Sequence, residues 1–198
     1  MPLPPTIRRI VLTGFMGAGK STIGALLAKK LDWVFVDSDV SIEASAGKKI
    51  AHIFAEDGED YFRDLETEAI YTQSRYLNQV LALGGGAMEN PATRAVLASL
   101  PETVIVFLDA PLEVMILRCL AQPGAAERPV LADRERLVQR FTGRLPFYRE
   151  AHLTVATENL EPLDVVERIL EQIMQNGSEI TESSSENTAL LAERPLAE

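Results

Sequence analysis

The segment GFMGAGKS, residues 14–21, constrains the fold more strongly than any other part of this chain. It follows a short apolar run and precedes a stretch with helical character, residues 20–31. The pattern G-x-x-x-x-G-K-[ST] is typical of a loop that joins a strand to a helix and curls its backbone N–H groups around phosphate oxygens. The positive end of the following helix adds to this attraction. We therefore predict a phosphate-binding loop whose contacts come from Gly17, Ala18, Gly19, Lys20, Ser21 and Thr22.

Five short apolar runs, separated by helical patterns, predict the fold class. The runs are rich in β-branched and aromatic residues and have the length of strands. Strands that alternate with helices favour an α/β fold, in which helices cover both faces of a parallel sheet. We expect a three-layer α/β/α sandwich with a five-stranded parallel sheet, with strands at 9–12, 33–36, 80–83, 104–108 and 153–156. Helices are expected at 20–31, 50–78 with a break near Gly58, 91–100, 112–120, 133–148 and from 162 to about 174.

Two aspartates follow the second expected strand, at the sheet edge where ligands of such folds bind. Asp37 and Asp39 are two residues apart, so both carboxylates point the same way if the backbone is extended. We expect Asp37 and Ser21 to hold Mg²⁺, and Asp39 to lie further out, near an acceptor hydroxyl. The structural alternative is a turn followed by a helix N-cap, because Asp and Ser favour both.

Asp109 is a second candidate metal ligand, because it also ends an apolar run. Pro111 and an apolar helix follow it, which is typical of the start of a helix. The adjacent residue is Ala110, where many ATPases carry glutamate. We therefore interpret Asp109 as structural.

Three consecutive glycines follow the third expected strand. Gly84, Gly85 and Gly86 have no side chains, so a ligand can approach their backbone closely and accept hydrogen bonds from their N–H groups. A flexible turn is the alternative interpretation. The position at the carboxyl end of a strand favours ligand contact.

Three arginines are candidates for binding an anion, because a guanidinium group binds carboxylates and phosphates through two parallel hydrogen bonds. Arg63 lies on an expected helix three residues before Glu66, and Arg144 lies on a later one. Arg128 follows a glycine- and alanine-rich stretch that has the character of a mobile lid. Spacing alone favours a surface role for each of these arginines, as it does for the Arg63–Glu66 pair.

Charge and composition exclude several classes of protein. The formal net charge of −10 argues against nucleic-acid binding, and no apolar run approaches the length of a membrane span. The single cysteine, Cys119, allows no intrachain disulfide, which suits a reducing cytoplasm. We expect a cytoplasmic monomer with one domain, residues 1–176. Residues 177–198 hold five glutamates and one arginine without aromatic residues, and we expect an acidic, disordered tail.

The motifs, taken together and in this order, resemble the shikimate kinase family. They are GFMGAGKSTIG, the DSD after the second strand, IFAEDGEDYFRDLE, LALGGGA, the RPVL of the lid and RLPFYREA. The resemblance covers residues 8–156, which is most of the expected domain. It implies a phosphate-loop kinase fold with a mobile lid at about 119–131, and transfer of the γ-phosphoryl group of ATP to the 3-hydroxyl of shikimate.

The resemblance also implies a role for each candidate residue. Lys20 and Ser21 would serve ATP and Mg²⁺ with help from Asp37, and Asp39 would bind the shikimate hydroxyls and act as base. Glu66 would orient neighbouring groups. Arg118 is followed by neutral residues as far as Glu127, so the pattern indicates no residue that covers the adenine. The remaining roles would fall to Arg63 and Arg144 at the shikimate carboxylate, to Gly84, Gly85 and Gly86 along the shikimate site, and to Arg128, which would close from the lid onto the phosphates.

Two other functions are compatible with the residues alone. One is a kinase for a related small molecule, such as gluconate, on the same scaffold. The other is a nucleotide-dependent switch that binds a metabolite without phosphorylating it. A GTPase switch would carry N-K-x-D to recognise guanine, and the chain has no such motif.

Overall fold

The computed structural model describes residues 3–4, 6–121 and 133–176. Within these ranges the chain forms a five-stranded sheet of order β2-β3-β1-β4-β5, in which every pairing is parallel. The predicted α/β class and parallel sheet are confirmed, and each strand overlaps its predicted range. The strands are β1 (Arg9–Thr13), β2 (Val34–Asp37), β3 (Gln79–Ala82), β4 (Thr103–Asp109) and β5 (Leu153–Ala156).

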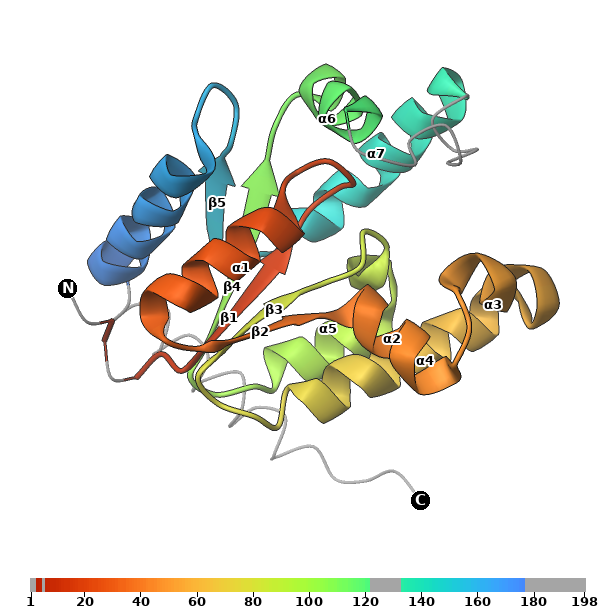
Figure 1. The fold of residues 1–198 in the computed structure, drawn as a ribbon, viewed down its shortest axis with the longest axis horizontal. Coiled ribbons are helices and arrows are strands. Elements are labelled where there is room, and N and C mark those ends of the chain that lie inside the picture. The colour runs from red at the N-terminus through yellow and green to blue at the C-terminus, as the bar shows by residue number, and fades with distance from the viewer. Residues whose placement is uncertain (1–2, 5, 122–132, 177–198) are drawn as a thin grey trace.

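Helices cover both faces of the sheet (Figure 1). The helix formed by residues 162–176 lies with α1 on one face, and α5 and α7 lie on the other (Figure 1). None of the helices in the described ranges combines the length and the apolar character that a bilayer span requires. The described residues also form α1 (Lys20–Leu31), α2 (Ser38–Ala46), α3 (Ile50–Glu56), α4 (Gly58–Gln73), η1 (Ala87–Glu89, 3₁₀), α5 (Pro91–Ala98), α6 (Leu112–Leu120) and α7 (Arg134–Tyr148).

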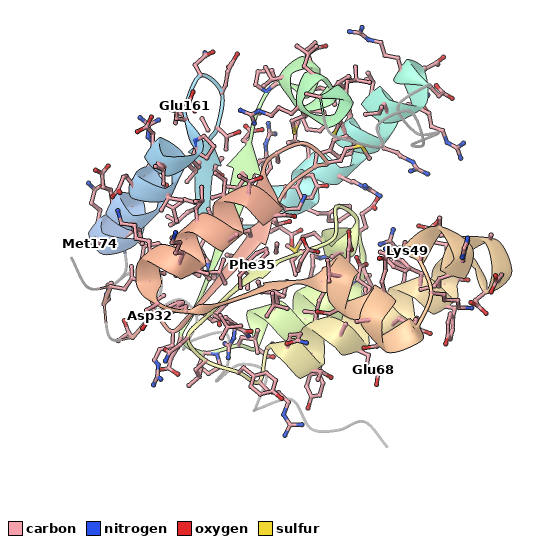
Figure 2. All side chains as sticks on the ribbon, viewed as in Figure 1. Asp32, Phe35, Lys49, Glu68, Glu161 and Met174 are labelled. Atoms are coloured by element: carbon pink, nitrogen blue, oxygen red, sulfur yellow. The ribbon has the colours of Figure 1, made fainter. Side chains whose placement is uncertain are left out.

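The central strands form the main core because their side chains are buried on both faces. All five residues of β1 are buried, and Ile10 lies in register with Val80 of β3 and Val104 of β4. On the α1 face, Phe35 of β2 packs so closely that a methyl group on Gly24 would lie 2.4 Å from its ring (Figure 2). The glycine therefore lets α1 approach the sheet, which fixes the direction of the loop before this helix.

A second, smaller core supports the region beside β2. Ile42 of α2, Ile53 of α3 and Phe62 of α4 are buried against one another. These three helices lie together at one end of the molecule (Figure 1). Since Phe62 is buried in this cluster, the next residue, Arg63, is held in a fixed position on α4.

Candidate active site

The predicted phosphate loop joins β1 to α1 and depends on glycine at three positions. Gly14, Gly17 and Gly19 have φ angles of +140°, +75° and +98°, which residues with side chains rarely adopt. A methyl group on Gly17 would also lie 2.2 Å from the carbonyl oxygen of Met115 in α6. The loop therefore packs directly on α6. Residues of the loop line a cavity of about 440 Å³, and Asp37 and Asp39 also line it.

Lys20 places its ammonium group inside the curve of this loop. Its Nζ donates to the carbonyl oxygen of Gly14 at 2.7 Å and to that of Phe15 at 3.1 Å. Burial lowers the pKa of Lys20 to about 8, although the nearby carboxylates of Asp39 and Asp37 favour the charged form. An anion bound in the loop would restore the charged state.

Asp37 joins the end of β2 to the phosphate loop. Its Oδ2 accepts a hydrogen bond from Ser21 Oγ at 2.7 Å, and its Oδ1 accepts one from the Asp39 backbone N–H at 3.1 Å. The assumption of extended backbone through this segment was wrong, because Asp37 is the N-cap of α2 and Asp39 lies in the first turn of that helix. Asp37 thus caps α2 and also lies at the position predicted for a metal ligand. The hydroxyl and carboxylate that sequence assigned to a metal lie side by side.

Asp39 and Glu66 approach each other at Gly84. A methyl group on Gly84 would lie 2.6 Å from Asp39 Oδ1 and 2.6 Å from Glu66 Oε1. Glu66 is buried, and its Oε1 has no hydrogen-bond partner among the described residues. Burial raises the pKa of both carboxyl groups; Asp37 raises that of Asp39 further, while Lys20 opposes the change. The glycine leaves room for a ligand hydroxyl to donate to either oxygen.

Arg63 and Arg144 converge on the next glycines from two different helices. A methyl group on Gly86 would lie 2.6 Å from Arg63 Nη2 and 3.0 Å from Arg144 Nη2. Arg63 donates to Glu66 Oε2 at 2.7 Å and to Glu59 Oε1 at 3.0 Å, both on its own helix. Two guanidinium groups that share one small region favour an anion between them. The structure thus brings together the arginines that spacing alone left at the surface.

The glycine segment itself is fixed by side chains from both sides. The backbone N–H of Gly84 donates to Ser38 Oγ at 2.9 Å, and the Tyr148 hydroxyl donates to the Gly85 carbonyl. The Tyr148 ring stacks on Phe107 of β4, with centroids 5.3 Å apart. Hydrogen bonds from two sides therefore hold the backbone of Gly84 and Gly85 in place, which favours a defined binding surface over a flexible turn.

The opposite end of the cavity contains a functional candidate that the sequence pattern did not indicate. Arg118 of α6 donates from Nη1 to Thr157 Oγ1 at 2.9 Å and from Nη2 to the Thr157 carbonyl at 2.7 Å. Both residues line the cavity together with Leu160, Pro162 and Val165. A planar cation beside apolar walls suits a flat aromatic base. No local signal could have found this pair, because 39 residues separate its members.

Three predictions concern residues that lie outside the described ranges or away from this cavity. Arg128 and most of the lid predicted at 119–131 lie outside the described residues, as does the tail at 177–198. Of the predicted lid, only residues 119–121 are described, and Cys119 and Leu120 are the last two residues of α6. Asp109 ends β4 and lines a different hollow, beside Phe141 and Arg149.

Comparisons with known proteins show the family to which this chain is related. Residues 16–174 match the family model described as shikimate kinase. A shikimate kinase of Persephonella marina is 41% identical over 84% of this chain and 99% of that protein. The chain belongs to the shikimate kinase family.

Solved structures of the shikimate kinase family have the same fold. The shikimate kinase from Acinetobacter baumannii, in complex with shikimate, aligns with a TM-score of 0.78 at 35% identity, over 86% of this chain and 95% of that one. The shikimate kinase from Aquifex aeolicus aligns with a TM-score of 0.73 at 35% identity, over 87% and 99% respectively. The three-layer kinase fold that the sequence predicted is thereby confirmed.

Proposed function

We infer that Arg63 and Arg144 hold the carboxylate of shikimate while the phosphate loop holds ATP, so that both substrates meet at Asp39. The chain is an ATP-dependent kinase that transfers the γ-phosphoryl group of ATP to the 3-hydroxyl of shikimate. The products are shikimate 3-phosphate and ADP, in the biosynthesis of aromatic amino acids.

The observation that carries this proposal is the convergence of two guanidinium groups on Gly86, beside two buried carboxylates at Gly84. An acceptor with a carboxylate at one end and hydroxyls at the other fits both the pair of guanidinium groups and the pair of carboxylates. Its carboxylate compensates the two positive charges, and its hydroxyls donate to Asp39 and to Glu66 Oε1, which has no hydrogen-bond partner within the described part of the chain.

Asp39 is the proposed base. Its carboxylate faces the cavity between the phosphate loop and Gly84, where the acceptor hydroxyl must lie to reach the γ-phosphoryl group. The raised pKa of Asp39 makes its carboxylate a stronger base than an exposed aspartate. Asp39 orients the hydroxyl and accepts its proton as the new P–O bond forms and the bond to ADP breaks.

ATP is bound by the phosphate loop, with Lys20 at the β- and γ-phosphates and with Arg118 and Thr157 beside the adenine. Ser21 and Asp37 are the proposed Mg²⁺ ligands; the described residues contain no larger cluster of acidic, His or Cys side chains. One carboxylate and one hydroxyl suit Mg²⁺, which commonly completes its shell with waters and substrate phosphates. The ion neutralises charge that develops on the transferred group. Arg128 is proposed to reach the phosphates from the lid.

An acceptor panel tests the function. ADP release is measured with shikimate, gluconate and nucleoside monophosphates, each over a range of concentrations. We expect shikimate to exceed the others by orders of magnitude in kcat/KM, because the site reads both a carboxylate and ring hydroxyls. Turnover of gluconate at a comparable rate would favour the alternative kinase, and shikimate binding without ADP release would favour a switch.

The monomeric state, the cytoplasmic location and the absence of nucleic-acid or membrane partners stay predictions.

Gly86→Ala should weaken shikimate binding without unfolding the protein. The φ of Gly86 is −105°, so alanine needs no unusual backbone conformation. Its methyl group would instead displace the flexible ends of Arg63 and Arg144. We expect the KM for shikimate to rise about tenfold or more, equivalent to the loss of roughly one charge-assisted hydrogen bond. Gly143→Ala on α7 is the matched control, because its methyl group would have no atom within 4 Å. An unchanged KM in Gly86→Ala would contradict the placement of the carboxylate.

ATP binding should take up protons above pH 8 through Lys20. The free protein holds Lys20 at a pKa of about 8, and the triphosphate raises this pKa by favouring the ammonium form. Affinity should therefore weaken as the pH rises above 8, and at about pH 8.5 binding should take up a substantial fraction of one proton. Calorimetry in buffers of different ionisation enthalpy measures this uptake. Lys20→Arg stays charged in this range and should show none; equal uptake in both would assign the proton elsewhere.

A further inference from the structure

Glu89 is a carboxylate at the edge of the site to which neither the sequence motifs nor the proposed mechanism assigns a role. It ends η1, the short helix that directly follows the three glycines. Its Oε2 accepts from Arg144 Nε at 2.8 Å. The side chain of Glu89 is 40% exposed, whereas that of Arg144 is 12% exposed.

The hydrogen bond uses only one edge of the Arg144 guanidinium. Nε is occupied by Glu89, while Nη1 and Nη2 are the nitrogens nearest to Gly85 and Gly86. The fork that remains is the one that a ligand carboxylate can bind through two parallel hydrogen bonds. We propose that Glu89 is a positioning residue, which holds Arg144 so that its terminal nitrogens face the shikimate carboxylate. This inference rests on the proposed function.

Arg144 needs such a partner more than Arg63 does. Arg63 is oriented by Glu59 and Glu66 of the same helix, so α4 alone fixes it. The carboxylate that orients Arg144 comes from a different element, 55 residues earlier in the chain. The guanidinium of Arg144 also lies 5.9 Å from the centroid of the Phe15 ring, which leaves its rotation in the ring plane open. The direction of the Arg144 fork therefore depends in large part on where η1 lies relative to α7.

A second contact holds η1 against α7. Arg94 donates from Nη1 to the carbonyl oxygens of Met88 at 2.7 Å and Glu89 at 3.0 Å. Its guanidinium lies 4.6 Å from the centroid of the Phe147 ring of α7, and its Nε lies 3.4 Å from Glu150 Oε2 just after that helix. Arg94 thus ties the backbone of Glu89 to the helix that carries Arg144. The position of Glu89 relative to Arg144 therefore depends on Arg94, which lies outside the proposed substrate site.

Charge and orientation predict opposite effects of removing Glu89, which makes the pair of variants Glu89→Ala and Glu89→Gln informative. Loss of the negative charge alone would strengthen the attraction between Arg144 and an anionic substrate. Loss of the acceptor would release Arg144 to other rotamers. Glutamine removes the charge but keeps an oxygen that can accept from Nε, whereas alanine removes both.

We expect Glu89→Ala to raise the KM for shikimate about tenfold, with kcat and the KM for ATP within about twofold of wild type. Glu89→Gln should stay within about threefold of the wild-type KM for shikimate, because it keeps the acceptor. The control is Glu68→Ala on α4, an exposed carboxylate away from the site (Figure 2), which should change nothing. A Glu89→Ala variant with unchanged or lowered KM, or a Glu89→Gln variant as impaired as Glu89→Ala, would overturn the orienting role.

A double-mutant cycle separates this inference from the proposed function. If Glu89 acts through Arg144, Glu89→Ala should add no further increase in KM to the Arg144→Ala variant. An additional increase of the same factor would mean that Glu89 acts independently of Arg144, and the inference would fail. If Arg144→Ala alone keeps the wild-type KM for shikimate, the proposed function of Arg144 fails instead, whatever Glu89 does.

Discussion

Asp39→Asn is expected to lower kcat by ~10²–10⁴-fold while leaving the affinity for ATP near that of wild type. The amide has the shape of the carboxylate but cannot accept the proton of the shikimate hydroxyl. Because Asp39 makes no side-chain hydrogen bond to the phosphate loop in the described structure, nucleotide contacts should persist. Steady-state ADP release gives kcat, and calorimetry with ATP gives the affinity.

The pH profile of the same variant distinguishes a base from a purely structural residue. Burial and the neighbouring Asp37 raise the pKa of Asp39, so the active carboxylate form is lost as the pH falls, at a higher pH than for an exposed aspartate. Wild-type kcat should fall on that acidic limb, and Asp39→Asn should lack it. A variant that keeps a tenth or more of the wild-type kcat would remove Asp39 from the role of base.

Asp37→Asn is the comparison for this prediction. Its effect should pass through the metal, because Asp37 pairs with Ser21 rather than facing Gly84. We expect a higher requirement for Mg²⁺ that excess Mg²⁺ partly relieves. The loss in Asp39→Asn should not respond to Mg²⁺.

Arg63→Ala and Arg144→Ala should each raise the KM for shikimate by ~10–100-fold, because each removes a charge-assisted contact worth about 1.5–3 kcal/mol. Turnover at saturation should fall less than binding. The two variants should differ in stability. Arg63→Ala leaves the buried carboxylate of Glu66 without its partner, whereas Arg144→Ala releases Glu89, whose side chain is 40% exposed and can be hydrated. We therefore expect a clearly lower Tm only for Arg63→Ala.

The control for the arginine variants is Arg140→Ala, an exposed arginine one turn earlier on α7. It should leave the KM for shikimate unchanged, which separates a specific contact from a general loss of positive charge. An equal rise in KM for all three variants would mean that long-range attraction, rather than a carboxylate site, explains the effect.

The features that could be predicted from sequence are those encoded locally. The apolar runs that became β1 and β4 are buried on both faces, and the glycine-lysine-serine pattern of the phosphate loop is contained in eight consecutive residues. α2 was missed because Ser38–Ala46 consists mainly of small and polar residues, with only Ser38 and Ile42 buried. An N-cap in this segment was considered only as an alternative to metal binding, whereas Asp37 caps α2 and still lies beside Ser21.

The convergence of side chains could not be predicted, because it depends on contacts between distant segments. Spacing indicated a surface pair for Arg63 and Glu66, whereas in the folded protein Glu66 is buried and Arg63 lies beside Gly86. The same holds for the Arg118–Thr157 pair and for Glu89 on η1, since each depends on the docking of one element against another. Family resemblance supplied the arginine roles, and the geometry now gives them a physical basis.

The most direct test of the carboxylate site compares shikimate with its methyl ester as acceptors. The ester keeps the ring and hydroxyls but carries no negative charge. It therefore removes the anionic partner of the proposed ion pairs, whereas the arginine variants remove the cationic partner. We expect kcat/KM for the wild-type protein to fall by ~10²-fold or more with the ester, since both guanidinium groups lose an ionised partner. In Arg63→Ala and Arg144→Ala the ester should cost much less. If wild type uses the ester as well as the acid, the two arginines do not bind a carboxylate, and the placement of the shikimate carboxylate at this site would be contradicted.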